Sequence, residues 1–288
     1  MFIKQRKEFE NLAFKRINHL LKRGIYIFDY EDNSIRKLKF SEIFNPKKIL
    51  FFHIHFSKGT SKTSSVSFKN GACKIVILSK EAECKAFYLW KTTYEMAVNS
   101  YKFYKVFPLK KCNILSFDDE KLAVEMEYLS GEPRRDKQSI LLLEKDYFNA
   151  LWSDTNLLVF TNGQLLGLSH GDFKWDNVIW QSESAYKIID FDFCGMRPFL
   201  FDLIHLHKSI NSTGKDLYQF FERNAEIIHK ILVKYDINFE LDNSDLVLFD
   251  YIQWELQNNP LGSKEYCFFD DFGKRKFCKS FELLKNSK

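Results

Sequence analysis

The chain has 288 residues, of which 45% are hydrophobic and 17% are aromatic, so it can bury a large core in one domain or two lobes. Its formal net charge of +5 is mild and spread along the chain, which argues against a dedicated nucleic-acid binder. The sequence has no apolar run of the roughly 18 residues that span a membrane, no apolar signal core near Met1, and no Cys-x-x-Cys spacing among its six cysteines. We therefore expect a cytoplasmic protein with reduced thiols and no zinc site.

The first predicted element is an amphipathic helix from Glu8 to Arg23, which stops at Gly24. Its polar face is basic and would suit an anionic membrane surface as a peripheral contact. A solvated face, with the apolar side packed onto the domain, is the commoner arrangement. We expect residues 1–45 to form a helical N-terminal extension. The basic residues of this face are Lys15, Arg16, Lys22 and Arg23.

A small antiparallel β lobe is predicted for residues 46–128. Strands are expected at Lys48 to Phe56, Ser64 to Phe68 and Ala72 to Leu78, because Asn70-Gly71 is a strong hairpin turn between the second and third. A helix is expected from Lys80 to Ala97. The loop between the first two strands contains Gly59, Thr60 and Ser61, whose backbone and hydroxyl donors could bind phosphates.

Residues 129–288 are predicted to form a larger, mostly helical lobe, and the whole chain an α+β fold. The strand Leu122 to Leu129 runs into the turn Ser130-Gly131 and joins the two lobes. Helical periodicity then dominates. The expected helices are Ile140 to Trp152, Phe199 to Ser209, Lys215 to Tyr235, Ser244 to Gln257, and a last one from Lys274.

The most informative motif is Ser169-His170-Gly171-Asp172-Phe173-Lys174-Trp175-Asp176-Asn177, followed by Ile188-Ile189-Asp190-Phe191-Asp192. Apolar runs on either side of a polar turn at residues 181–185 predict a hairpin that returns Asp190 to the side of Asn177. Metal-assisted phosphoryl transfer needs an acceptor for a hydroxyl proton, oxygen ligands for Mg²⁺, and a nearby cation. Asp172 suits the first role, Asn177 and Asp190 the second, and Lys174 the third.

These motifs resemble the catalytic and metal loops of the aminoglycoside phosphotransferase and choline kinase family, relatives of protein kinases in which His-Gly-Asp replaces His-Arg-Asp. The resemblance implies a two-lobed protein-kinase-like fold that uses ATP and Mg²⁺. It implies that Asp172 is the catalytic base and that Asn177 and Asp190 are magnesium ligands. Asp202 matches a buried aspartate that supports the catalytic loop in this family.

The resemblance also implies nucleotide contacts in the small lobe. A lysine on a strand, paired with a glutamate on the following helix, would hold the α and β phosphates. Lys74 and Glu83 are the first candidates, and Lys80, Glu81 and Glu95 compete with them. Backbone groups of Glu127 and Leu129, in a segment that resembles the kinase hinge, would bond the adenine edge.

The acceptor is expected to be a hydroxyl of a small molecule or glycan, such as an amino alcohol, an aminoglycoside or a surface-polysaccharide sugar. Asp202 follows Asp190 by only twelve residues, which leaves little room for a peptide-binding activation segment. A protein Ser/Thr kinase and an inactive ATP-binding scaffold remain as alternatives. A second Asp-Phe-Gly, at residues 271–273, is too far from the catalytic loop to be the metal site and reads as a turn. The candidates for an acceptor pocket are Asp250, Trp254, Glu255, Asp270 and Asp271.

Overall fold

A computed structural model of the chain describes residues 10–15, 17, 21, 23–29, 34–42, 52–55, 63–69, 74–79, 83–154, 157–210, 214–237, 247, 250, 251, 253 and 254. The chain folds as two compact units. Unit 1 comprises Met1–Val98 and Cys112–Leu129, and unit 2 comprises Asn99–Lys111 and Ser130–Lys288. Helix α3, Lys91–Tyr104, begins in unit 1 and ends in unit 2.

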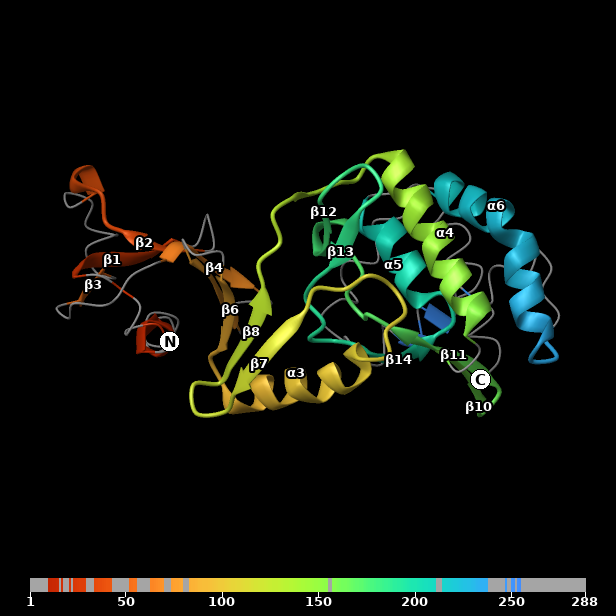
Figure 1. Cartoon of the computed structure of the whole chain (residues 1–288), viewed down its shortest axis with the longest axis horizontal. Coiled ribbons are helices and arrows are strands. Elements are labelled where there is room, and N and C mark those ends of the chain that lie inside the picture. Colours follow the sequence, from red (N-terminus) through yellow and green to blue (C-terminus); the bar gives the residue numbers. More distant parts are fainter. Residues whose placement is uncertain are drawn as a thin grey trace. The chain divides into compact units, whose positions relative to one another are not determined.

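Unit 1 is built on an eight-stranded sheet in the order β3-β1-β2-β4-β5-β6-β8-β7, in which all neighbouring strands are antiparallel. A short 3₁₀ turn, η2, covers Phe40–Glu42. Figure 1 shows these strands in red to yellow. The strands are β1 Gly24–Asp29, β2 Ser34–Lys37, β3 Phe52–His55, β4 Thr63–Lys69, β5 Lys74–Ser79, β6 Glu83–Tyr88, β7 Ile114–Asp118 and β8 Ala123–Glu127.

The core of unit 1 joins the N-terminal helical segment to this sheet. Residues 10–15 and 17 are helical, and Ala13, Phe14 and Ile17 are buried in one cluster with Ile75 and Phe87 of the strands. A helix lying on a membrane would need this apolar face for lipid. In the structure the face is used for packing inside unit 1.

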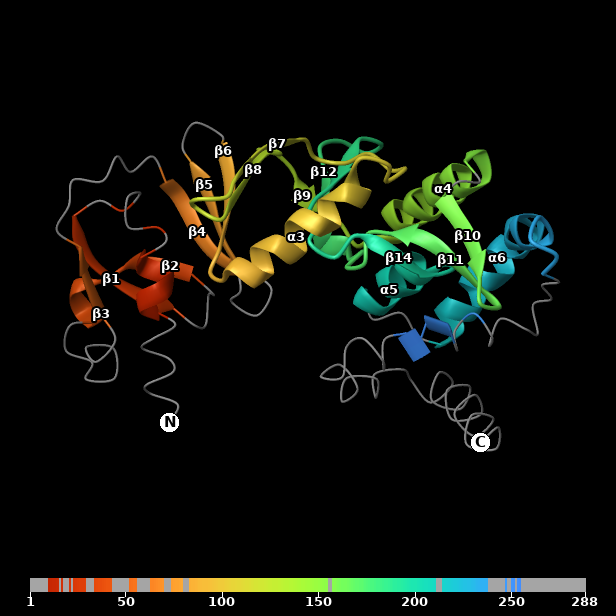
Figure 2. The same ribbon diagram turned by 90° about the horizontal axis from the view of Figure 1, so that it is seen from below.

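Unit 2 combines three helices with two three-stranded sheets, seen from two directions in Figures 1 and 2. The helices are α4 Lys137–Ser153, α5 Phe201–Ser209 and α6 Gly214–Val233. One sheet has the order β10-β11-β14 and the other β13-β12-β9. Their strands are β9 Glu132–Pro133, β10 Leu158–Thr161, β11 Gln164–Ser169, β12 Val178–Trp180, β13 Tyr186–Ile188 and β14 Gly195–Pro198.

A buried carboxylate connects helices α4, α5 and α6 of unit 2. Glu144 of α4 is 2% exposed and accepts hydrogen bonds from Arg223 of α6 at 2.8 and 2.9 Å, while its Oε1 lies 2.9 Å from Nε2 of His207 on α5. Burial alone would raise the pKa of Glu144, but its bonds with His207 and Arg223 outweigh burial and lower it. Glu144 therefore stays ionised and fixes α5 in place.

The structure confirms the α+β class, with an antiparallel β part and a mainly helical part. It confirms the β4–β5 pairing and the hairpin of β12 and β13. Three of the expected helices of unit 2 are found at α4, α5 and α6, and the described residues of a fourth, expected from Ser244 to Gln257, are helical. Asn70-Gly71 and the helix expected from Lys274 lie outside the described residues, and the lobe boundaries at 45 and 128 stay predictions.

Two expectations for unit 1 are wrong. Residues 24–37 form β1 and β2 instead of part of a helical extension. The helix expected from Lys80 to Ala97 begins only at Lys91, because Glu83–Tyr88 pairs as strand β6 with β5 on one side and β8 on the other. This strand buries Ala86, Phe87 and Tyr88 in succession, so this part of its sequence shows no alternation of apolar and polar residues.

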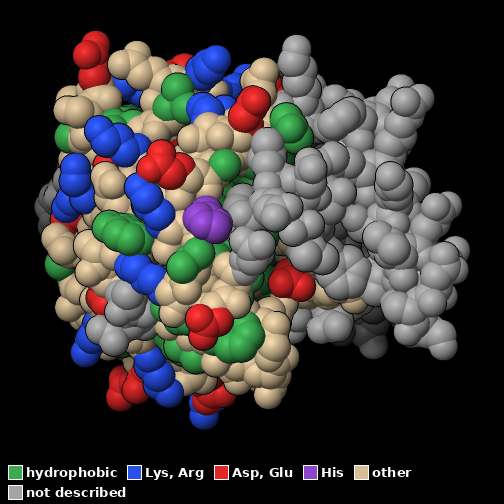
Figure 3. All heavy atoms as spheres, turned by 90° about the vertical axis from the view of Figure 1, so that its right-hand side faces the viewer, with side chains coloured by type: hydrophobic (Ala, Val, Ile, Leu, Met, Phe, Trp, Pro, Cys, Tyr) green, Lys and Arg blue, Asp and Glu red, His purple; other side chains and the backbone are tan. Residues whose placement is uncertain are grey.

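No helix among the described residues is long and apolar enough to cross a membrane. On the face of the molecule that Figure 3 presents, basic and acidic side chains are interspersed, and the described residues form no continuous basic stripe there.

Candidate active site

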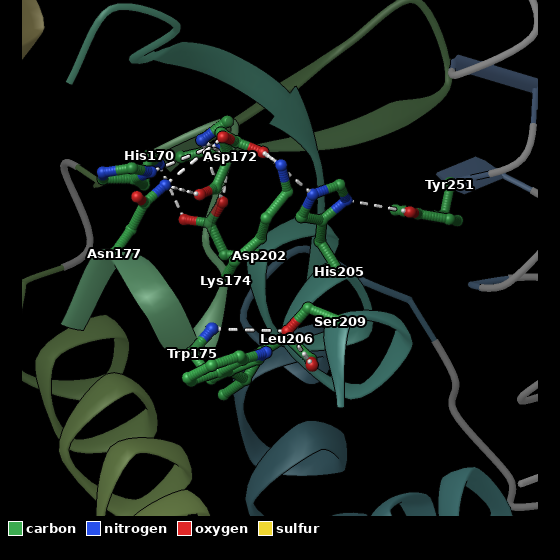
Figure 4. Close-up of polar contacts among 12 residues, drawn as sticks. His170, Asp172, Lys174, Trp175, Asn177, Asp202, His205, Leu206, Ser209 and Tyr251 are labelled. Atoms are coloured by element: carbon green, nitrogen blue, oxygen red, sulfur yellow. Dashed lines mark hydrogen bonds and ion pairs between the residues drawn. The ribbon is translucent and has the colours of Figure 1, made fainter. Parts of the chain in front are cut away.

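The candidate active site lies entirely in unit 2, where β11 ends and the loop of residues 170–174 begins (Figure 4). Backbone hydrogen bonds close this loop from Lys174 N to Asp172 O, 2.9 Å, and from Asn177 N to Lys174 O, 3.0 Å. The second bond forms the 3₁₀ turn η4, Trp175–Asn177, which leads into β12. The chain therefore turns sharply at the motif and presents Asp172 and Asn177 together.

Asp202, in the first turn of α5, anchors the loop. Its carboxylate is fully buried and accepts from the backbone N–H groups of His170 at 2.7 Å and Gly171 at 3.0 Å. It also accepts from the hydroxyls of Ser169 at 2.6 Å and Tyr147 at 3.1 Å. The expected support of the catalytic loop by Asp202 is thus confirmed by four hydrogen bonds.

Glycine is required at position 171 by the backbone conformation and by the atoms that lie close to its Cα. Its φ is +86°, where residues with a Cβ are strained. A Cβ there would lie 2.2 Å from the carbonyl oxygen of Phe193 and 2.5 Å from Cζ of Arg197. The close approach of these groups fixes the start of the loop.

Asp172 is held by three side chains. Its Oδ1 lies 2.7 Å from Nζ of Lys174 and 3.3 Å from Nε2 of His205, and Nδ2 of Asn177 donates to its Oδ2 at 3.3 Å. Burial alone would raise the pKa of Asp172, but the bonds with His205 and Lys174 outweigh burial and hold it well below the usual range for a carboxyl. Asp172 is therefore an ionised carboxylate, able to accept a proton and not to donate one.

The structure brings Asn177 and Asp190 together as expected. Ile189 N donates to Asn177 O at 2.9 Å, which carries the β12–β13 pairing one step past the strand ends and sets Asp190 beside Asn177. Nδ2 of Asn177 also donates to the backbone carbonyl of Asp172 at 2.8 Å, so the amide oxygen is the group left to bind a ligand. Asp190 has a φ of +66°, a strained conformation found mostly where surrounding contacts impose it.

An amide oxygen and a carboxylate are hard donors that suit Mg²⁺. Within the described part of the chain, no group of three or more His, Cys, Asp or Glu side chains could hold a metal ion. A magnesium ion at Asn177 and Asp190 would therefore take its other ligands from phosphate and water. This fits the partial coordination that a nucleotide-bound magnesium needs.

Residues 188–192, which match the metal loop of the resembled family and are called the metal loop below, pack against an aromatic cluster. Phe191 is fully buried and its ring lies 4.6 Å from that of His170 and 5.2 Å from that of Phe107. Asp172 N donates to Nδ1 of His170 at 3.3 Å, so Nε2 carries the proton and donates to Ile189 O at 2.8 Å. Burial lowers the pKa of His170 and keeps this tautomer neutral.

Helix α3 contacts the metal loop through its last turns. Ser100 Oγ donates to the backbone carbonyl of Asp192 at 2.7 Å, and the Tyr101 hydroxyl lies 3.4 Å from Oδ1 of Asp192. Glu95, a competing candidate for a charged helix partner, instead forms an exposed ion pair with Lys91 in its own helix. The described part of α3 therefore meets the metal loop through hydroxyl groups.

The small-lobe residues expected to bind nucleotide are only partly described. Gly59, Thr60 and Ser61 lie outside the described residues, as do Lys80 and Glu81. Lys74 is 3% exposed in β5, with Nζ 5.7 Å from the ring centre of Tyr88. Glu127 ends β8, its backbone N–H donating to Asn113 O at 2.9 Å, and Leu129 follows in the extended segment that leaves the strand.

The structure does not bring Lys74 and Glu83 together. Lys74 pairs with Tyr88 and Leu78 pairs with Cys84, so Glu83 lies at the far end of the β5–β6 ladder. Glu83 and Tyr88 are five positions apart, about 17 Å of extended chain. The expected ion pair between these two residues is therefore wrong in this structure.

Sequence reasoning missed three residues around Asp172. His205 and Tyr251 lie on one side of its carboxylate, and buried Arg197 lies beneath Gly171 with its guanidinium 4.7 Å from the Trp254 ring. Only the spacing of His205, three residues after Asp202, could have placed it on the face of α5 that meets the loop. The second Asp-Phe-Gly, at residues 271–273, lies outside the described part of the chain.

The part of the chain that contains this site is similar to known proteins. The phosphotransferase enzyme family, APH, matches residues 117–226, a span from β7 to α6 that contains the whole catalytic loop and the metal loop. This match confirms, for the central part of the chain, the resemblance that the His170 to Asn177 motif indicates. Over these residues the chain is therefore similar to the APH phosphotransferases.

A probable serine/threonine-protein kinase, mkcE, from Dictyostelium discoideum is 29% identical over 133 residues. The alignment covers 43% of this chain and 17% of that protein. Among solved structures, a choline/ethanolamine kinase family protein from Mesorhizobium loti gives a TM-score of 0.41 at 12% identity, covering 78% of this chain and 90% of its own. The choline kinase LicA from Streptococcus pneumoniae gives 0.40 at 12% identity, with 78% and 94% covered.

A stability measurement tests the anchor. We expect Asp202→Ala to lower the free energy of unfolding by more than about 3 kcal/mol, because four buried donors lose their acceptor and each costs roughly 1–3 kcal/mol. Urea denaturation of the purified protein measures this. Asp176→Ala, the same change at an exposed carboxylate of the same loop, is the control. Equal effects of the two changes would contradict the anchoring role.

Proposed function

We propose that the protein is an ATP-dependent phosphotransferase that moves the γ-phosphate of ATP to a hydroxyl of a small molecule or glycan. The observation that carries the proposal is the ionised Asp172 carboxylate, held beside two oxygen ligands, Asn177 and Asp190. A general base, metal ligands and a cation are the parts that phosphoryl transfer requires. The APH family match over residues 117–226 supports the same reaction class.

In the proposed reaction, the acceptor oxygen forms a bond to the γ-phosphorus while the bond from that phosphorus to the β,γ-bridging oxygen breaks, and ADP leaves. Asp172 accepts the hydroxyl proton. Its Oδ2 is the better placed oxygen, because Asn177 contacts it at 3.3 Å whereas Lys174 and His205 both contact Oδ1. Lys174, 41% exposed and 2.7 Å from Oδ1, keeps a positive charge near the moving phosphoryl group.

Asn177 and Asp190 would hold Mg²⁺, which when bound neutralises phosphate charge. Asn177 is positioned by its bond to Asp172 O, and Asp190 by the β12–β13 hairpin. In unit 1, we propose that Lys74 contacts the phosphates and that the backbone of Glu127 and Leu129 contacts the adenine. Lys74 is 3% exposed in strand β5, which fits the strand lysine that the family resemblance implies.

The segment after the metal loop supports a small acceptor. Residues 195–198 form β14, which pairs with β11, and α5 begins at Phe201. The segment between Asp190 and Asp202 is thus used inside unit 2. A protein kinase would need a longer segment here to bind an extended peptide.

A cationic acceptor receives little support from the described candidates for its pocket. Burial raises the pKa of Asp250, against a hydrogen bond with Gln164 that lowers it, and so disfavours its charged form. The ring of Trp254 already faces the guanidinium of Arg197. Glu255, Asp270 and Asp271 lie outside the described residues. We therefore propose a hydroxyl acceptor and leave its charge open.

One screen separates this proposal from its alternatives. The full-length protein is incubated with Mg²⁺-ATP and panels of amino alcohols, aminoglycosides, glycans and a generic Ser/Thr protein substrate, and products are read by mass shift. Phosphorylation of the protein substrate alone would favour the serine/threonine kinase alternative. Nucleotide binding with no transfer to any panel would favour an inactive scaffold.

Replacing the proposed base should separate binding from transfer. Asp172→Asn keeps the size and shape of the side chain but removes the proton acceptor, so ATP should still bind while transfer falls by roughly two to four orders of magnitude. Isothermal titration with ATP and the product assay measure the two effects. Transfer at close to the wild-type rate would show that Asp172 is not the base.

Replacing the proposed metal ligand should weaken metal-dependent binding. Asp190→Ala removes a carboxylate from the magnesium site, so turnover should fall and the magnesium concentration required for nucleotide binding should rise. Asp271→Ala, at the second Asp-Phe-Gly, is the matched control and should leave the magnesium requirement for nucleotide binding within a small factor of wild type. A deeper loss from Asp271→Ala would move the metal site there.

The phosphate-binding lysine can be tested by a ranking. Lys74→Ala should raise the KM for ATP more than Lys80→Ala, because Lys74 places a buried cation in the central sheet of unit 1. Steady-state kinetics of both variants decide this. The reverse ranking would assign the role to Lys80.

A further inference from the structure

Three side chains form a continuous line that ends at the proposed base (Figure 4). The Tyr251 hydroxyl lies 3.1 Å from Nδ1 of His205, and Nε2 of His205 lies 3.3 Å from Oδ1 of Asp172. Tyr251 is 1% exposed and the His205 side chain 12% exposed, so the line is largely shielded from solvent. None of the roles proposed above uses Tyr251, and none requires a histidine on α5.

The chemistry of the two ends fixes the proton positions on the histidine. An ionised carboxylate only accepts hydrogen bonds, so Nε2 of His205 must carry a proton to bond with Asp172. In the neutral ring Nδ1 is then an acceptor, and the Tyr251 hydroxyl is its donor. Each hydrogen bond in the line therefore points toward Asp172.

The histidine is also fixed in space. Its ring stacks on Phe201 with a centroid distance of 5.7 Å and an interplanar angle of 10°. His205 follows Asp202 by three residues, so the two side chains lie on the same face of α5. One helix face thus binds the backbone of the catalytic loop through Asp202 and its reactive side chain through His205.

We propose that His205 is a positioning residue for Asp172 and that Tyr251 holds its ring in the tautomer that donates to the carboxylate. This inference rests on the proposed function, in which Asp172 takes the acceptor proton. His205 and Lys174 together occupy Oδ1, which turns Oδ2 toward the incoming hydroxyl. Lys174 is the more exposed and flexible of the two partners, so the buried histidine supplies the fixed orientation.

Three variants test this role. The assay measures the hydrolysis of Mg²⁺-ATP to ADP, in which water is the acceptor. His205→Phe keeps an aromatic ring for stacking on Phe201 but removes the N–H donor, and kcat should fall about 10- to 100-fold, the usual scale for losing a hydrogen bond to a charged group. The KM for ATP should stay within about twofold, since the ground-state contacts of the nucleotide remain. His205→Gln returns an N–H donor and should recover about half of the loss on a logarithmic scale.

Tyr251→Phe removes only the hydroxyl and should lower kcat about 3- to 10-fold, because the ring can then adopt the other tautomer. His229→Phe, on the exposed side of α6, is the matched control and should leave kcat unchanged. Equal losses from His205→Phe and His205→Gln, together with a lowered melting temperature, would show a merely structural residue and overturn the proposal. A wild-type kcat in His205→Phe would overturn it as well.

A measurement that needs no turnover separates this proposal from the proposed function. Nitrogen-15 NMR of the histidine rings should show His205 protonated at Nε2 in the wild-type protein, with its Nδ1 resonance shifted in Tyr251→Phe. An Nδ1-protonated ring would overturn the positioning role, whatever the activity. If the wild-type protein neither binds nor turns over Mg²⁺-ATP while the ring is protonated at Nε2, the proposed function fails, and with it the role of His205 in transfer, although the hydrogen-bonded line stands.

Discussion

The buried carboxylate of Asp202 is the constraint on which the rest of the candidate site depends. A charge with no exposed surface is costly unless hydrogen bonds replace its water, and four donors do so here. Two of them are backbone N–H groups of His170 and Gly171, so the charge is stabilised only when the loop has this conformation. The position of α5 and the conformation of the catalytic loop are therefore coupled through Asp202.

That anchor lets two separate segments converge on one carboxylate. The β12–β13 hairpin returns the chain to Asn177 and sets Asp190 beside it, while α5 brings His205 to the opposite side of Asp172. The strained φ of Asp190 and the tight contacts at Gly171 are the local costs of this convergence. They are offset by packing behind the loop, where Phe191 fills the space between His170 and Phe107.

The parts of the site that the sequence predicted are those encoded locally. Asp172, Asn177 and Asp190 lie within one loop and one hairpin, whose turn residues and apolar runs are visible in 24 consecutive residues of the chain, from 169 to 192. His205 and Tyr251 were missed because their role depends on how α5 and a later segment pack. The local spacing of apolar residues does not show this packing. Strand β6 was mistaken for helix because Ala86, Phe87 and Tyr88 are buried in succession and do not alternate with polar residues, so only the pairing with β5 and β8 identifies the strand. The Lys74 and Glu83 pairing failed with it, since the pairing assumed that Glu83 belongs to the helix.

The packing around β14 also limits which acceptors the proposed phosphotransferase could use. Arg197 lies directly after Met196 in β14, its guanidinium is within 2.5 Å of where a side chain at Gly171 would begin, and it faces the ring of Trp254. The segment that protein kinases leave available for peptide is therefore committed here to the loop and to the C-terminal residues packed on α5. In the proposed reaction the acceptor hydroxyl approaches Oδ2 of Asp172, because Lys174 and His205 both contact Oδ1. The short loop at this oxygen favours a compact acceptor over an extended peptide in that proposal.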